Sequence, residues 1–393
     1  MVEIKTPRIE SIDILRGVVM VIMALDHIRD YFYYGSFFND PENLETTTPF
    51  LFFTRFITHY CAPVFIFLAG TSAYLYGSKK TNSELFKFLF TRGVWLIFLA
   101  FVVNNFVWKF DLTNSFIILQ VIWAIGLCMV LLSFLTFLPA RILLIIGITL
   151  IVGHNLLDGI VMQGTSTKSI VWYILHQQQF IQVGDRLIAF MYPIIPWVGL
   201  ICLGFCFGTF YKKGFDVSIR KKWLLRLGIG ATMLFFILRG INLYGDLVPW
   251  EAQDTSTKTI LSFMRVTKYP PSLAYILITM GPALLFLYGI ETVKNKVTDF
   301  FLVFGRVPLF YYFSHILVIH VLAIIGILIF GGEWKNMILT ADVFMNAKLL
   351  NYGYSLFVVY LIWIVVIALL YFPCKKYMIY KAINKDKWWL TYL

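Results

Sequence analysis

The stretch that decides the fold is residues 11–34, SIDILRGVVMVIMALDHIRDYFYY. It is long enough and apolar enough to cross a hydrocarbon core of about 30 Å as a helix. It nevertheless carries six ionisable side chains: Asp13, Arg16, Asp26, His27, Arg29 and Asp30. An ionisable group at membrane depth costs roughly several kcal/mol unless it pairs with another charge or lines a wet cavity. The stretch therefore predicts a membrane helix that contributes to a functional site.

The composition of the whole chain agrees with a membrane protein. Of the 393 residues, 60% are hydrophobic and 14% are charged. No polar interval much exceeds about 30 residues, which is too short for a soluble domain with its own core. We predict an all-α, polytopic integral membrane bundle that fills residues 1–393 as a single domain, with a last span and basic tail at 354–393. Ten spans are expected, at about residues 12–34, 50–77, 84–107, 115–136, 140–156, 187–211, 223–245, 272–292, 307–331 and 354–374.

Basic residues between the spans predict the orientation. They cluster in the loops on the side of the N-terminus, as at residues 79–80, 212–213 and 220–222, and are scattered on the other side. The positive-inside rule then places both termini in the cytoplasm. The net charge of +12 is explained by this topology and by attraction to anionic headgroups of the lipid bilayer. It does not indicate nucleic-acid binding.

The first two predicted spans share a group of ionisable residues near the outer surface. Asp26 and Arg29 are three apart and can pair along one helix face. Asp30 lies three residues beyond His27, where a carboxylate would orient the imidazole and raise its basicity. The second span brings Arg55 and His59 to the same depth from the opposite direction. The hairpin therefore predicts one polar cluster below the outer surface.

This cluster has two interpretations. It is either a salt-bridge network that locks two helices around satisfied histidines, or a site at which histidine moves protons near neutral pH. Six ionisable groups at one depth favour a site.

The other four histidines are weaker candidates. His315 and His320 are five apart and lie on different faces of one helix, so each is best explained as a core histidine bonded to a neighbouring helix. A further polar group near the outer surface forms either a polar mouth for a hydroxyl-rich substrate or a solvated loop, and the solvated loop is favoured. Its residues are His154, Asn155, Asp158, His176, Asp185 and Arg186. No histidine or acidic ligand set has convincing spacing, so no metal site is expected.

Four stretches together resemble a known family. They are RIESIDILRGVVMVIMALDHIRDYF (8–32), THYCAPVFIFLAGTSAYLYG (58–77), YPIIPWVGLICLGFCFG (192–208) and FGRVPLFYYFSHILVIH (304–320). The set is similar to bacterial relatives of heparan-α-glucosaminide N-acetyltransferase, in the transmembrane acyltransferase superfamily, over about residues 8–320. The family's RGxxxxxM…H pattern falls on Arg16, Gly17, Met23 and His27.

The resemblance implies a multi-span enzyme of a bacterial cytoplasmic (inner) membrane. Such an enzyme takes an acetyl or other short acyl group from cytoplasmic acetyl-CoA or another acyl-CoA. It delivers this group to a carbohydrate-like acceptor, an amino sugar or a sugar hydroxyl, on the outer side.

The chain departs from the lysosomal member of this family at the histidines. That enzyme places its catalytic histidine in the first lumenal loop, whereas residues 28–58 here contain no histidine. This chain has His27 where that enzyme has asparagine, and His59 where it has an aspartate before the proline. Catalysis is therefore expected at His27, and the glucosamine substrate is not carried over.

The chemistry assigns roles to the candidate residues. Attack on a thioester needs a base with a pKa near 7, for which His27 is the first choice, with His59 as partner or substitute. Asp26 and Asp30 complete the expected catalytic group. The remaining candidates serve charge stabilisation or substrate binding (Arg29, Arg55, His320) or the CoA moiety (Arg16, Arg92, Arg306, His315).

The competing hypothesis is a transporter or flippase for a small metabolite or lipid-linked sugar that uses the same cluster as its binding site. Transporters often contain two related halves, and no internal symmetry is visible in this sequence. The enzyme is therefore favoured. Exposed faces of the spans would permit a homodimer.

Overall fold

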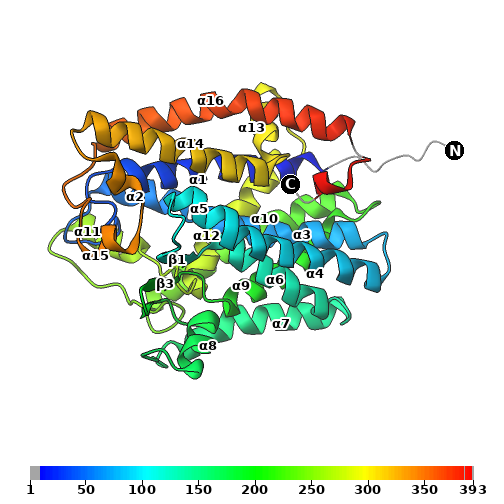
Figure 1. Ribbon diagram of the computed structural model, residues 1–393. Coiled ribbons are helices and arrows are strands. Elements are labelled where there is room, and N and C mark those ends of the chain that lie inside the picture. The colour runs from blue at the N-terminus through cyan, green and yellow to red at the C-terminus, as the bar shows by residue number, and fades with distance from the viewer. Residues whose placement is uncertain (1–8, 385, 392–393) are drawn as a thin grey trace.

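The computed structural model describes residues 9–384 and 386–391 and shows a bundle of long helices (Figure 1). Arg8, where the family resemblance begins, and Lys385 of the basic tail lie outside the described residues. The long helices and their short extensions are α1 (Glu10–Phe32), α2 (Pro49–Thr58), α3 (Cys61–Gly77), α4 (Asn82–Leu99), η1 (Ala100–Asn104), α5 (Asn105–Lys109), α6 (Val121–Leu135), α7 (Ala140–Gly153), η2 (His154–Leu157), α9 (Ile195–Phe207), η3 (Gly208–Tyr211), α10 (Val217–Ile241), α12 (Leu273–Ile290), α14 (Pro308–Ile329) and α16 (Leu356–Ile383). The remaining helices are α8 (Thr167–Leu175), α11 (Ser256–Met264), α13 (Lys296–Gly305), η4 (Trp334–Met337), α15 (Ala341–Met345) and η5 (Trp388–Thr391).

The predicted helical membrane bundle is confirmed. Each expected span contains a helix, and seven segments among the described residues are long and apolar enough to cross a membrane. These are Pro49–Gly77, Asn82–Lys109, Ala140–Leu157, Val217–Ile241, Leu273–Ile290, Pro308–Ile329 and Leu356–Ile383. Helix α1, which carries the charged side chains, is not among these seven, and α6 and the segment formed by α9 and η3 are shorter. The count of ten spans therefore stays a prediction.

The prediction was wrong about how two spans begin. Residues expected to open the spans at 115 and 187 form strands, β1 (Phe116–Leu119) and β3 (Arg186–Phe190), in a sheet completed by β2 (Gln179–Val183). The strand order is β1-β3-β2, with β1 parallel and β2 antiparallel to β3. Both stretches are short runs rich in isoleucine and phenylalanine, which suit a strand. Pro196, in the first turn of α9, suits the start of a helix after β3.

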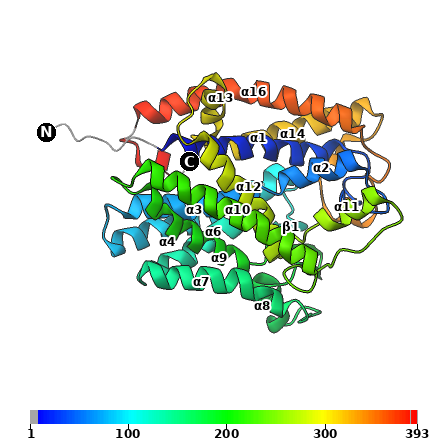
Figure 2. The ribbon, with the colours of Figure 1, turned by 180° about the vertical axis from the view of Figure 1, so that it is seen from behind.

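Helix α1 lies at the centre of the bundle. It packs against α13, α14 and α16, and Figures 1 and 2 show it between α16 on one side and α3 and α12 on the other. Gly17 of α1 lies so close to α13 that a Cβ atom would overlap the carbonyl of Phe301. Asp13, Asp26 and Arg29 of the decisive stretch are buried inside this packing, whereas the Asp30 side chain is 39% exposed.

The two ends of the bundle differ. The inner end, as we call it, holds the start of α1 and the end of α16, and both ends of the described chain lie there (Figure 1). The outer end holds the sheet, α8, α11 and α15 (Figures 1 and 2). All helices that contribute to the site run between these two ends.

Candidate functional site

Two cavities enter the bundle, one from each end. The inner cavity has a volume of about 410 Å³, and its basic lining residues are Arg16, Arg92, Arg306 and Lys381. The outer cavity has a volume of about 490 Å³, and its charged or histidine lining residues are Asp26, His27, Arg29, Asp30, Arg55, Lys109 and Lys268. Tyr312 and Val121 line both cavities. The two cavities therefore border the same two residues, and we call this place the junction.

His27 lies on the outer side of this junction. Its Nδ1 is 2.8 Å from Nε2 of His315 on α14, and the two rings stack with their centroids 5.0 Å apart. The indole of Trp108 packs edge-on against the His27 ring at 4.7 Å. Among the described residues, Nε2 of His27 has no hydrogen-bond partner, so this nitrogen is left for a molecule in the cavity.

The direction of the hydrogen bond between the two histidines follows from a backbone carbonyl. Nδ1 of His315 lies 2.9 Å from the carbonyl oxygen of Tyr311. A carbonyl only accepts hydrogen bonds, so His315 carries its proton on Nδ1 and, when neutral, accepts at Nε2. His27 must then donate from Nδ1. Its Nε2 is left with a lone pair, which is the form that a general base requires.

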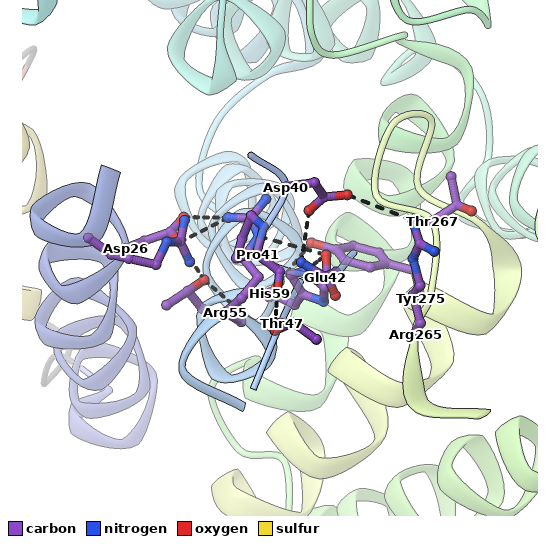
Figure 3. Close-up of polar contacts among 12 residues, drawn as sticks. Asp26, Asp40, Pro41, Glu42, Thr47, Arg55, His59, Arg265, Thr267 and Tyr275 are labelled. Atoms are coloured by element: carbon purple, nitrogen blue, oxygen red, sulfur yellow. Dashed lines mark hydrogen bonds and ion pairs between the residues drawn. The ribbon is translucent and has the colours of Figure 1, made fainter. Parts of the chain in front are cut away.

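Acidic and basic side chains of α1, α2 and the loop between them form a continuous chain of ion pairs. Figure 3 shows its part from Asp26 through Arg55 to Glu42. Arg29 Nη2 contacts Asp26 Oδ1 at 2.7 Å and Asp30 Oδ1 at 2.6 Å. Arg55 Nη1 donates to both oxygens of Asp26, at 2.9 and 2.8 Å. Thr58 Oγ1 adds a further hydrogen bond to Asp26 at 2.8 Å. The predicted pairing of Asp26 with Arg29 is confirmed.

Glu42, which the sequence did not single out, completes this chain of charges. Its carboxylate lies 3.2 Å from His59 Nε2 and 3.8 Å from Arg55 Nε. Burial alone would raise the pKa of Glu42, but the neighbouring His59 and Arg55 outweigh it and lower the pKa to about 2. Glu42 precedes α2 by several residues in a polar loop, so only the return of this loop over the outer end brings it to His59.

Two expected contacts of the catalytic group were wrong. Asp30 does not bind His27, because its carboxylate pairs with Arg29 and His315 takes the orienting position. His59 lies outside the outer cavity, fully buried against Glu42 and Tyr275, whose hydroxyl donates to the His59 carbonyl at 2.7 Å. His59 therefore does not share a cavity with His27, and helical spacing alone could not reveal this.

His315 and His320 also lie away from their expected partners. His315 was expected to hold CoA, but it does not line the inner cavity and contacts His27 instead. His320 was expected to contact substrate, but it lines neither cavity. Its ring nitrogens face the carbonyls of Val107 at 3.0 Å and Met337 at 2.7 Å. His320 thus joins α14 to neighbouring segments, as a core histidine would.

The junction between the cavities contains polar residues that the sequence analysis missed. The Tyr312 hydroxyl donates to Asn104 Oδ1 at 2.9 Å, and Asn104 Nδ2 donates to Gln120 at 3.2 Å. Asn104 belongs to the π-helical segment η1, and such irregular turns are frequent at functional sites. The signal was present as polar residues inside an otherwise apolar span, but Tyr312 and Asn104 are about two hundred residues apart along the chain.

The inner cavity gathers three of the four residues expected to bind CoA. Arg16 donates to Asp13 at 2.8 Å and to Ser72 at 3.2 Å. Arg306 lies 3.3 Å from Glu10. Lys381, near the end of α16, also lines the cavity and was not expected. Among the residues that the structure describes, no acidic side chain lines this cavity, so its wall favours an anion.

Comparison with known proteins gives one family. The family model "Heparan-alpha-glucosaminide N-acetyltransferase, catalytic" matches residues 8–239, and the stretch at 304–320 lies beyond this match. Comparison with curated proteins finds no match. Because the family model covers more than half of the 393 residues, the chain belongs to the heparan-α-glucosaminide N-acetyltransferase catalytic family.

Proposed function

We propose that the protein is a membrane-embedded acetyltransferase. It takes an acetyl group from acetyl-CoA at the inner end and transfers it to an acceptor that enters from the outer end. The observation that carries the proposal is that both cavities border Tyr312, with His27 beside this junction. The inner end then faces the cytoplasm, as the distribution of basic residues predicts.

The inner cavity suits acetyl-CoA. Its four basic residues offer charge-assisted hydrogen bonds to phosphate groups. Most of its remaining lining is apolar or aromatic, for example Met20, Met23 and Phe65, which suits the pantetheine arm. The thioester at the end of this arm would reach the junction at Tyr312.

The outer cavity suits a carbohydrate-like acceptor. Aromatic side chains, among them Tyr31, Trp108 and Tyr192, lie beside charged and amide groups. Aromatic faces pack against sugar rings, and polar groups placed around them bind hydroxyls and amines. We propose an amino sugar or a sugar hydroxyl as the acceptor.

The chemistry assigns His27 the role of general base. Its Nε2 takes the proton from the acceptor amine or hydroxyl while the acceptor attacks the thioester carbonyl. The new N–C or O–C bond forms as the C–S bond breaks, and the released CoA thiolate takes a proton on the inner side. His315 holds the His27 ring through the Nδ1–H and stabilises the imidazolium that forms.

The experiment is binding and slow hydrolysis of labelled acetyl-CoA by detergent-purified protein. Wild type is expected to bind and hydrolyse acetyl-CoA, and His27→Gln to bind it with hydrolysis lost. His59→Gln is the matched histidine control, expected to retain hydrolysis because His59 lies outside the cavity. Absence of acetyl-CoA binding by the wild type would overturn the proposal and favour a transporter.

A further inference from the structure

A cluster of metal-ligating side chains lies at the outer end, outside both cavities. It consists of His154 at the start of η2, Asp158 just after η2, and His176 at the end of α8. One ligand atom from each residue lies within 4.8 Å of the other two. His176 Nε2 and Asp158 Oδ1 are already 3.0 Å apart. None of the three residues lines the inner or the outer cavity.

The two imidazoles are buried without adequate partners. His154 is 2% exposed and His176 is 3% exposed. Both ring nitrogens of His154 and Nδ1 of His176 have no hydrogen bond among the described residues. Each unsatisfied buried polar atom costs roughly 1–3 kcal/mol. His154, with neither ring nitrogen bonded, lies next to the pair formed by His176 and Asp158, so one of its nitrogens is available to a ligand shared with that pair.

We propose that His154, Asp158 and His176 bind a divalent transition metal ion, zinc, with water as the fourth ligand. Two imidazoles and one carboxylate suit zinc, whereas calcium and magnesium prefer oxygen ligands. Bonds of about 2 Å place tetrahedral ligand atoms roughly 3.3 Å apart. The pair formed by His176 and Asp158 is already at this separation, and His154 has to approach by at most about 1.5 Å.

The groups around the cluster hold its side chains by hydrogen bonds, as the neighbours of metal ligands do. Asn155 Nδ2 donates to the other oxygen of Asp158 at 2.8 Å, and Asn155 Oδ1 accepts from the Leu273 amide of α12 at 3.0 Å. The carbonyl of Pro271 lies near the His154 ring without hydrogen-bond geometry. It is the natural acceptor for one His154 N–H once the other nitrogen binds metal. The Asp158 side chain, 14% exposed, gives the ion a path from solvent.

The ion would connect elements that form the wall of the outer cavity. His154 follows α7, and His176 ends α8 three residues before β2 begins. Strand β2 pairs with β3, and Leu187 and Ala189 of β3 line the outer cavity. Zinc would therefore tie α7, α8 and the sheet together and hold this wall in place. This role does not depend on the reaction proposed above.

The test measures zinc bound to the full-length protein. Protein purified with a histidine-free tag is stripped with a chelator, dialysed against zinc and analysed for metal. Wild type is expected to bind one zinc per chain, and its thermal unfolding midpoint is expected to rise by about 2–6 °C. His154→Gln combined with His176→Gln should lose both effects. Asp185→Asn, in the exposed turn between β2 and β3, should keep both.

A second measurement uses wild-type protein alone, so it tests the proposal even if the double variant fails to fold. Cobalt added to stripped wild-type protein is expected to give the visible absorption of a tetrahedral site, and one equivalent of zinc should displace it. Wild-type protein that binds no stoichiometric zinc would overturn the proposal. Equal binding by a folded double variant, or preference for magnesium over zinc, would do the same.

Discussion

At the scale of single residues, His27 is set apart from the charges next to it on α1. Asp26 and Asp30 pair with Arg29, and Asp26 also pairs with Arg55, whereas the His27 ring turns toward His315 and the cavity. We expect His27→Gln to lower the rate of acetyl transfer by roughly 10²- to 10⁴-fold, because the general base is lost. Acetyl-CoA binding should stay within a few-fold of wild type. Rates and binding constants measured on the same preparation check this, and a rate within threefold of wild type would refute the role.

His315 is a positioning residue in this account, so its variants should differ according to hydrogen bonding. His315→Leu removes the acceptor for the His27 Nδ1–H and should lower kcat by roughly 10²-fold or more, because the His27 tautomer is no longer fixed. His315→Gln supplies an amide oxygen in its place and should recover a large part of kcat. Equal losses in the two variants would show that packing, rather than the hydrogen bond, matters at this position.

Glu42 makes the stability of the outer loop dependent on pH. Its pKa is lowered from 4.5 to about 2, so the folded protein stabilises the charged carboxylate. This contribution, roughly 3 kcal/mol, is fully present above about pH 5 and is lost as the pH falls toward 2. Glu42→Gln should unfold at a lower temperature than wild type at pH 7. The difference between the two unfolding midpoints should decrease steadily between pH 5 and pH 3. Thermal unfolding in detergent across this pH range measures the difference. A difference that does not change with pH would contradict the role of the Glu42 charge.

At the scale of helices and strands, close backbone contacts hold the bundle together. Gly204 of α9 faces α3 so closely that a Cβ atom would overlap the carbonyl of Phe67. We expect Gly204→Ala to destabilise the protein by about 1–3 kcal/mol, since two packed helices must move apart. Gly230→Ala on α10 is the matched control, because nothing lies within 4 Å of its added carbon. Unfolding midpoints that fall equally in both variants would count against this contact.

The positions of the helices could be predicted well, because they depend on residues that lie close together along the chain. The apolar runs located a helix in every expected span, because length and hydropathy dominate the insertion of a helix into a membrane. The runs at 116–119 and 186–190 were assigned to helices, because a short apolar run gives no information about its pairing partner. Only the meeting of β1 with β3, about seventy residues away along the chain, makes them strands.

The same limit applies to the site. Pairing of Asp26 with Arg29 followed from helical spacing, and the depth of Arg55 followed from the span boundaries. The partners His315 for His27, Glu42 for His59, and Asn104 for Tyr312 come from distant segments or from a loop. Their positions depend on how the helices are ordered in the bundle, which hydropathy does not determine.

At the scale of the whole molecule, the polarity of the bundle matches a reaction across a membrane. Within the described part of the chain, the charged residues that line the inner cavity are all basic, whereas the outer cavity mixes both charges with aromatic rings. The two cavities approach from opposite ends and share Tyr312. In the proposed function, a donor and an acceptor would meet there without either one crossing the bilayer.

The most direct test of this central claim uses sealed vesicles with the protein in one orientation. Acetyl-CoA is supplied at one face at a time, and the initial release of the CoA thiol is measured for wild type and for His27→Gln. The account predicts release only when acetyl-CoA reaches the inner end, and at least a 10²-fold slower release in the variant. Equal release from either face, or release unchanged in His27→Gln, would contradict it.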